Sequence, residues 1–201
     1  METPLRSSVD TVVADTSRAF GTFVGLLWLC VLVGIVATRA VDTASVQFVG
    51  PVELLWAATF VVAALGTTWL EGGGYERLGA DPDGGPTFAW LVVLFVPLAF
   101  LPLWLASTRL LGEPTVPNIP FVLFATLLSG WLAFYGGLER LDLESDDFTR
   151  VFGYVVALGV PIAGAAWLFD DGTVVSDPVA AALAIVVQAA ACWLGVVRRG
   201  R

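Results

Sequence analysis

Two polar residues lie inside long apolar stretches of the sequence, where they could contact a solute. Glu53 is the sixth residue of an apolar segment that begins at residue 48, and Gln188 is the eleventh residue of one that begins at residue 178. A charged or amide side chain inside a membrane is costly, so it faces protein or water and often binds a substrate or an ion. Glu53 and Gln188 are therefore candidate substrate-binding residues.

Both candidates have a structural alternative. If the helix begins at Leu54, Glu53 lies at the outer lip of the membrane, just after Pro51, instead of inside it. Small residues surround Gln188 at helical spacing, a pattern typical of close helix–helix packing with an interhelical hydrogen bond from the amide. These residues are Ala180, Ala181, Ala184, Ala191, Cys192 and Gly195. The pattern favours packing for Gln188. For Glu53, the sequence allows a place inside the membrane or at its outer lip.

A motif of six residues occurs twice, at an offset of 63 residues. The first copy is Gly73-Gly74-Tyr75-Glu76-Arg77-Leu78 and the second is Gly136-Gly137-Leu138-Glu139-Arg140-Leu141. In the functional interpretation, two cytoplasmic glycine turns present Glu-Arg pairs to a partner or an anionic headgroup. In the structural interpretation, which the residue types favour, the glycines end a helix and the arginine anchors it at the membrane interface.

The residue types that the sequence lacks exclude several classes of chemistry. There is no histidine, and all ten basic residues are arginine. The chain therefore cannot build a histidine-ligated haem, a Ser-His-Asp or Cys-His catalytic group, or a lysine Schiff base. Cys30 and Cys192 lie in apolar segments without a CxxC partner, which favours buried free thiols. The acidic loops lack the spacing of a calcium loop, so we expect no cofactor and no metal site.

The candidate residues lie in or beside predicted apolar helices. The sequence is 57% hydrophobic and only 14% charged, with a mean hydropathy of +0.83, which is typical of a membrane protein. Apart from Glu53, six segments of about 20 residues contain no charge, and this is the length that crosses a bilayer as a helix. They are residues 19–38, 48–70, 88–107, 119–138, 151–169 and 178–197.

The predicted fold is therefore all-α, an integral membrane bundle of six helices. It has a cytoplasmic segment at 1–18, a transmembrane domain at 19–197 and a basic cytoplasmic tail at 198–201. If the N-terminus is inside, eight arginines lie on the inner side and two on the outer side. The positive-inside rule then predicts a multi-pass protein of the cell membrane with both termini in the cytoplasm.

Several local patterns refine this prediction. Because both copies of the repeated motif lie on the same side, the first four helices are predicted to form two parallel hairpin repeats, with the last two helices as a diverged third copy. Pro97 and Pro102 predict a bend in the third span. The spacing of Arg109 and Glu113 predicts a local ion pair.

The charged residues of the sequence indicate which partners the protein can have and which proteins its composition resembles. Net charge is -8, which argues against a nucleic-acid partner. An excess of acidic residues together with the loss of lysine resembles the composition of multi-pass membrane proteins of halophilic archaea. This resemblance covers composition only, and it implies an acidic surface that stays hydrated in concentrated salt.

These observations predict a non-enzymatic membrane component, an accessory or scaffold subunit of an unspecified process. The alternative is a small solute transporter or the substrate-capture subunit of a larger transporter, and a membrane enzyme acting through carboxylates ranks third. The predicted partners are the lipid bilayer and either another membrane protein or a second copy of the chain. A polar cavity that reaches Glu53 or Gln188 favours transport, whereas a dry interface of small residues favours the scaffold.

Overall fold

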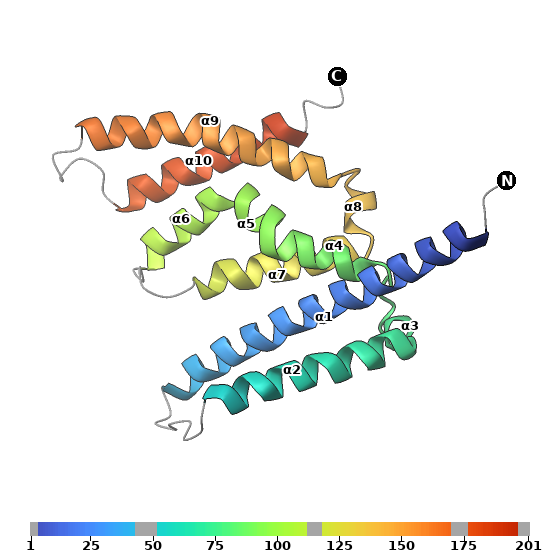
Figure 1. Cartoon of the computed structure of the whole chain (residues 1–201). Helices are drawn as coiled ribbons and strands as arrows, with labels where there is room; N and C mark the ends of the chain where they lie inside the picture. The colour runs from blue at the N-terminus through green and yellow to red at the C-terminus, as the bar shows by residue number, and fades with distance from the viewer. Residues whose placement is uncertain (1–3, 43–51, 112–117, 170–176, 197–201) are drawn as a thin grey trace. The chain divides into compact units, whose positions relative to one another are not determined.

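The structure, a computed structural model, describes residues 4–42, 52–111, 118–169 and 177–196 (Figure 1). Within these ranges the chain is all-α, with helices joined by short turns and no strand. The chain divides into two compact units. Unit 1 comprises Met1–Ala89 and Leu132–Gly136, and unit 2 comprises Trp90–Trp131 and Gly137–Arg201. Each unit is described by itself below.

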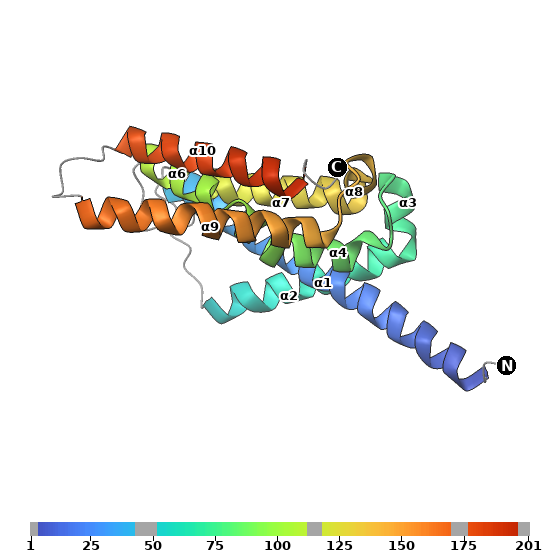
Figure 2. The same ribbon diagram turned by 90° about the horizontal axis from the view of Figure 1, so that it is seen from above.

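Unit 1 is built on α1 (Pro4–Asp42) and α2 (Val52–Trp69), which pack side by side. The chain continues into a π-helical turn η1 (Leu70–Gly74), a single helical turn α3 (Tyr75–Leu78) and the start of α4 (Gly84–Trp90). Figures 1 and 2 show that the first turns of α1 reach beyond α2 and α3.

Glycines on α1 allow α4 to approach closely. A Cβ atom added to Gly21 would lie 2.5 Å from the backbone of Pro86, and one added to Gly25 would lie 2.8 Å from the ring of Phe88. No real Cβ atom tolerates a backbone contact as short as the first of these. The GxxxG spacing of Gly21 and Gly25 therefore serves the contact between α1 and α4.

Unit 2 contains the remaining helices. They are the π-helical turn η2 (Leu91–Phe95), α5 (Val96–Ala99), α6 (Leu101–Leu111), α7 (Ile119–Phe134), α8 (Gly137–Arg140), α9 (Ser145–Phe169) and α10 (Asp177–Val196). Helix α10 packs against both α6 and α9, and Figure 2 shows it beside them. Small residues make this contact close, because Ala106, Ala181 and Ala184 form one buried cluster. A Cβ atom added to Gly195 would lie 2.6 Å from the side chain of Val151.

The bend predicted in the third span is present. The helical axis turns by 71° between Gly84–Ala99 and Leu101–Leu111. Phe100 lies at the break with φ of -109°. Pro102 has no N–H to donate to a carbonyl one turn earlier, so the hydrogen-bond ladder is interrupted there.

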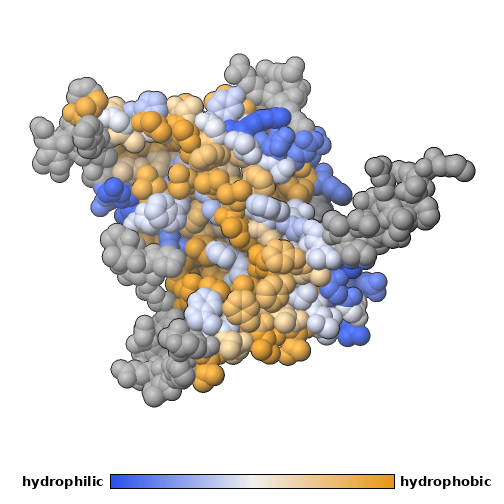
Figure 3. All heavy atoms as spheres, in the orientation of Figure 1, coloured by the Kyte–Doolittle hydropathy of each residue, from blue (hydrophilic) through white to orange (hydrophobic). Residues whose placement is uncertain are grey.

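Three helices are long and apolar enough to cross a membrane, and the count rises to four if the bent pair is one span. These helices are Asp15–Ala37, Ser145–Ala165 and Asp177–Val196. Large apolar side chains are exposed on the described helices, among them Leu65 at 67% and Leu127 at 72%. In Figure 3, hydrophobic atoms gather along α1 and α2, and hydrophilic ones gather at the α3 end of unit 1. These findings are weak evidence for association with a membrane.

Some predicted helix boundaries differ from those observed. Helix α1 begins at Pro4, before the predicted start of the first span at residue 19, and its candidate membrane span is Asp15–Ala37. Helix α7 ends at Phe134 instead of residue 138, because Gly136 has a φ of +65° and the chain turns there. Helix α9 begins at Ser145, six residues before the predicted span. Its first turn contains Ser145, Asp146 and Asp147, and the two carboxylates lie at the positive end of the helix dipole.

Candidate functional site

An ion pair joins α1 to the π-helical turn in unit 1. The guanidinium of Arg18 lies 2.7 Å from Glu71 Oε2, and its Nε donates a hydrogen bond of 2.9 Å to the same oxygen. A second carboxylate, that of Asp83, lies 3.8 Å from Arg18 Nη1. Both partners of the main pair are only part-exposed, at 34% for Arg18 and 21% for Glu71. The pair therefore fixes the end of α2 against α1.

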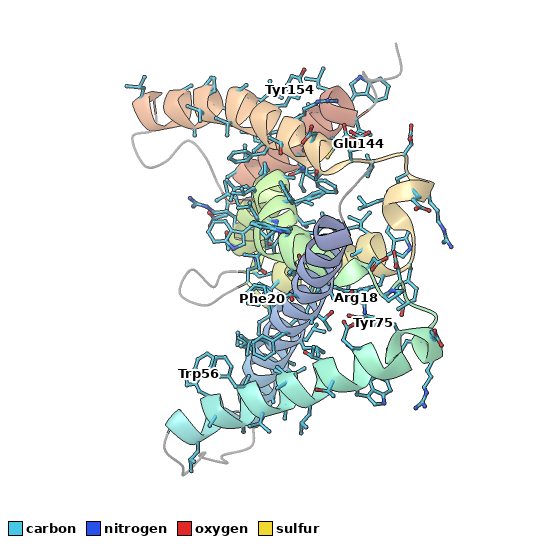
Figure 4. The ribbon with its side chains drawn as sticks, turned by 45° about the vertical axis from the view of Figure 1, so that its right-hand side comes forward. Arg18, Phe20, Trp56, Tyr75, Glu144 and Tyr154 are labelled. Atoms are coloured by element: carbon cyan, nitrogen blue, oxygen red, sulfur yellow. The ribbon has the colours of Figure 1, made fainter. Side chains whose placement is uncertain are left out.

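Two buried hydroxyls extend this cluster inward. Thr22 and Tyr75 are 3% and 4% exposed, and their oxygens are 2.8 Å apart. Thr22 Oγ1 also lies 3.0 Å from the carbonyl oxygen of Arg18 and 3.2 Å from Glu71 Oε1. Since Thr22 has a single proton for these two acceptors, the Tyr75 hydroxyl is free to donate to Thr22. Figure 4 shows Arg18 and Tyr75 close together at this end of the unit.

We call Arg18, Thr22, Glu71 and Tyr75 the polar cluster. Burial raises the pKa of the Tyr75 hydroxyl above its usual value, and the negative charge of Glu71 acts in the same direction. Tyr75 is thus held as a neutral hydrogen-bonding group.

A cavity of about 270 Å³ begins beside the polar cluster. Its walls come from α1, α2, α4 and the last residues of unit 1. Apart from the Thr22 and Tyr75 side chains at one end, the wall is apolar and aromatic, with Leu26, Leu29, Trp69, Phe88 and Phe134 as its larger residues. Four glycines, Gly21, Gly25, Gly66 and Gly85, line it without filling it.

The repeated sequence motif forms the same backbone turn twice. We call residues 73–84 the first elbow and residues 136–147 the second elbow. Each elbow opens on a glycine with positive φ, +101° at Gly73 and +65° at Gly136. Each continues into one helical turn, α3 or α8, and each ends that turn on a left-handed residue, Gly79 at +62° or Asp142 at +51°.

Three backbone hydrogen bonds repeat between the elbows at the offset of 63 residues. In the first elbow, the bonds are Gly79 N to Glu76 O, Ala80 N to Tyr75 O, and Gly84 N to Asp81 O, at 3.2, 3.0 and 3.1 Å. In the second elbow, they are Asp142 N to Glu139 O, Leu143 N to Leu138 O, and Asp147 N to Glu144 O, at 3.1, 2.9 and 3.0 Å. The first two bonds of each set are the pair that ends a helix in a Schellman motif. The sequence repeat therefore corresponds to a structural repeat.

The remaining motif residues divide into buried glycines and exposed charges. Gly74 and Gly137 are buried, and a Cβ atom on Gly74 would lie 2.8 Å from the Trp69 ring. The charged residues Glu76, Arg77, Glu139 and Arg140 are all exposed. The glycines thus have a packing role, and the charged pairs face outward from their turns.

Gln188 lies buried in unit 2, where its amide joins α10 to the bent helix. The side chain is 5% exposed, and its Nε2 donates to the carbonyl oxygen of Ala99 at 3.0 Å. Ala99 is the last residue of α5, next to the break at Phe100. The same nitrogen lies 3.3 Å from Cys192 Sγ, and Oε1 has no hydrogen-bond partner among the described residues.

Two other predicted residues have different outcomes. Glu53 is the second residue of α2, and its side chain lies outside the described part of the chain, so both interpretations of Glu53 stay predictions. Arg109 pairs with Asp177 at 3.1 Å, which links α6 to α10. Glu113, its predicted partner, also lies outside the described residues.

Sequence reasoning missed the polar cluster completely. A signal was present, since Thr22 follows Arg18 by four residues and Tyr75 follows Glu71 by four. Residues four apart share a helix face, so each helix end carried two polar groups on one side. Such spacing is common at helix ends, and it does not show that two faces will meet.

Comparisons of the chain with protein-family models, with curated proteins and with solved structures give no match. The function is therefore inferred from the geometry of these sites alone.

Proposed function

We propose that this protein is a six-span integral membrane protein, with both termini in the cytoplasm, that acts as a non-enzymatic accessory or scaffold component. The observation that carries the proposal is the use of Gln188. Its amide donor is taken up by the backbone of a neighbouring helix, in a contact lined by small residues. A midplane amide N–H used in this way holds helices together, and this donor is not available to a passing solute.

The exposed apolar surface supports the membrane location. Helix α2 exposes Leu54, Trp56, Phe60, Val61, Val62, Leu65 and Trp69. These positions lie on several sides of the helix, so a single buried face does not account for them. Lipid, or a partner within the membrane, is the environment that covers such a surface. In this proposal α2 and the 16-residue α7 complete the six spans. At about 1.5 Å per residue, α7 is roughly 24 Å long and reaches across a thin or locally thinned bilayer.

Orientation is tested by cysteine labelling in a background that lacks Cys30 and Cys192. From the arginine count, we expect a cysteine at Ser176 to react with an impermeant thiol reagent from outside, and one at Ser145 to be protected. Labelling of Ser145 with protection of Ser176 would overturn the orientation.

The scaffold role is tested with Gln188→Leu. Because the variant leaves the Ala99 carbonyl without its donor, we expect a loss of about 1 to 3 kcal/mol in the free energy of unfolding. A panel of amino acids, sugars and inorganic ions should shift the melting temperature of the wild type and of the variant equally. Ala182→Leu, at an exposed position on the same helix, is the matched control.

One observation favours the second candidate, a small solute carrier. Gln188 Oε1 is a buried acceptor without a partner among the described residues, and a solute with a donor group would satisfy it. A solute that raises the melting temperature of the wild type, but not that of Gln188→Leu, would replace the scaffold proposal with this one.

A further inference from the structure

The cavity in unit 1 has the size of an organic group. An apolar protein cavity of about 150 Å³ stays dry and binds benzene. The 270 Å³ here is nearly twice that volume. By proportion it holds a hydrocarbon segment of roughly ten carbon atoms. Its apolar wall offers water few hydrogen bonds, so hydrocarbon is the favoured occupant.

The polar end of the cavity does not recruit a polar ligand by itself. Thr22 and Tyr75 satisfy one another, and Thr22 has further acceptors in Glu71 and in its own helix. These groups therefore line one end of the cavity without needing a polar ligand. An apolar tail gains from burial along the wall without breaking this network.

The charges around this polar end select among headgroups. Arg18 is the only cation in the cluster, and it lies beside the carboxylates of Glu71 and Asp83. Asp15, one turn earlier on α1, adds to the negative field at Arg18. The local charge is thus negative, and an anionic headgroup at this end would meet repulsion.

We infer that this cavity binds the single hydrocarbon tail of an amphiphile whose headgroup is uncharged or cationic. The tail lies between α1 and α2 against Leu29 and Phe88, and the headgroup lies at the Arg18 end. This site is separate from Gln188 and does not depend on whether the protein is a scaffold or a carrier.

The experiment uses the full chain in phosphatidylcholine vesicles and a decyl maltoside with a diazirine at the end of its tail. After illumination, mass spectrometry locates the labelled residues. We expect labelling of the cavity wall around Leu29 and Phe88, and a large excess of unlabelled decyl maltoside should remove most of it. Label on outward-facing residues such as Val33 reports bulk lipid, so it should not respond to the competitor.

Leu29→Trp fills the cavity, and Val33→Trp is its matched control. Leu29 is 36% exposed and lines the cavity, whereas Val33 is 66% exposed and lies one turn further along the same helix. We expect Leu29→Trp to reduce the competitor-sensitive labelling about tenfold, a loss of ~1.4 kcal/mol in binding, and Val33→Trp to leave it unchanged. If Leu29→Trp does not fold, Gly66→Ala narrows the same cavity from α2, because its Cβ displaces Leu26.

Competing headgroups complete the test. Decyl trimethylammonium and decyl maltoside should displace the probe at least about fivefold better than decyl sulfate, the ratio that ~1 kcal/mol of repulsion gives. Cavity labelling that ignores the competitor, or that falls equally in Leu29→Trp and Val33→Trp, would overturn the site. Better competition by decyl sulfate would overturn the headgroup assignment and with it the proposal.

Discussion

The two elbows share a backbone and differ in what they bury. Each begins on a positive-φ glycine and carries the same three backbone hydrogen bonds. The first elbow buries Tyr75 in a polar cluster and sets Gly84 against the end of α7. The second buries the carboxylate of Asp147, which is 2% exposed. The repeated motif therefore encodes a turn, whereas the chemistry beside each turn depends on residues outside the motif.

Gly84→Ala should produce the largest effect on the first elbow. A Cβ atom at this position would lie 2.6 Å from both the carbonyl oxygen of Ala133 and the ring of Phe134, and the backbone oxygen cannot move away cheaply. We expect a loss of about 3 kcal/mol in the free energy of unfolding, measured by circular dichroism during denaturant titration in mild detergent.

Gly72→Ala is the control for this change, because Gly72 has a φ of -79° and no atom within 4 Å of an added Cβ. Its effect should stay within about 0.5 kcal/mol. Equal effects at the two glycines would show that the first elbow is not tightly packed against α7.

Asp147→Ala tests the corresponding position of the second elbow. Asp147 Oδ2 accepts a hydrogen bond of 2.8 Å from the backbone of Glu144, and Oδ1 lies 3.2 Å from Arg150. Loss of this cap and of the buried carboxylate should cost about 2 kcal/mol. Asp146→Ala removes the same charge from an exposed position in the same turn, so it should cost no more than about 0.5 kcal/mol.

Tyr75→Phe should give a smaller loss that depends on pH. Removing the hydrogen bond to Thr22 should cost about 1 kcal/mol at neutral pH. Because the folded protein raises the pKa of Tyr75, it holds the phenolic proton more tightly than the unfolded chain does. The stability from Tyr75 is therefore fully present below the usual tyrosine pKa of about 10, and it is lost as pH rises through the raised pKa.

The measurement is the difference in unfolding free energy between wild type and Tyr75→Phe across this pH range. The difference should be constant below pH of about 10 and shrink above it. Tyr135→Phe, at a half-exposed position, controls for general alkaline unfolding. A difference that does not change with pH would contradict the buried, neutral state of Tyr75.

A reciprocal exchange at the end of the elbow turns should have the smallest effect. Gly79 and Asp142 occupy equivalent left-handed positions, which glycine adopts without strain and aspartate adopts at some cost. We expect Asp142→Gly to stabilise the protein by about 0.5 kcal/mol and Gly79→Asp to destabilise it by a similar amount. Thermal unfolding followed by circular dichroism measures both. A change of the same sign in both variants would argue against equivalent elbows.

Local patterns predicted the features that depend on neighbouring residues. Pro97 and Pro102 predicted the bend, because a proline acts on the turn of helix that contains it. The recurrence of Gly73 at Gly136 predicted the elbows, since positive φ is a property of a single residue. The last apolar segment, predicted at 178–197, corresponds closely to α10 (Asp177–Val196), because an apolar run is also a local feature.

Contacts between distant residues were not predictable in this way. Arg18 bonds Glu71 across 53 residues, and Arg109 bonds Asp177 across 68. Which helix faces meet depends on the summed packing of many side chains, such as Gly21 against Pro86 and Gly66 against Leu26. The cavity is the space that these contacts leave unfilled, so no local sequence pattern predicts it.

The hydrogen bond between Gln188 and Ala99 can form only late in the synthesis of the chain. The two residues are 89 positions apart in the chain. Translation adds about 5–20 residues per second, so Gln188 is made roughly 5 to 20 s after Ala99. In the membrane location proposed above, the carbonyl at the break must be satisfied by water, lipid headgroups or the insertion machinery until α10 is made. A nascent chain that stops before α10 would then expose a polar defect that membrane quality control can recognise.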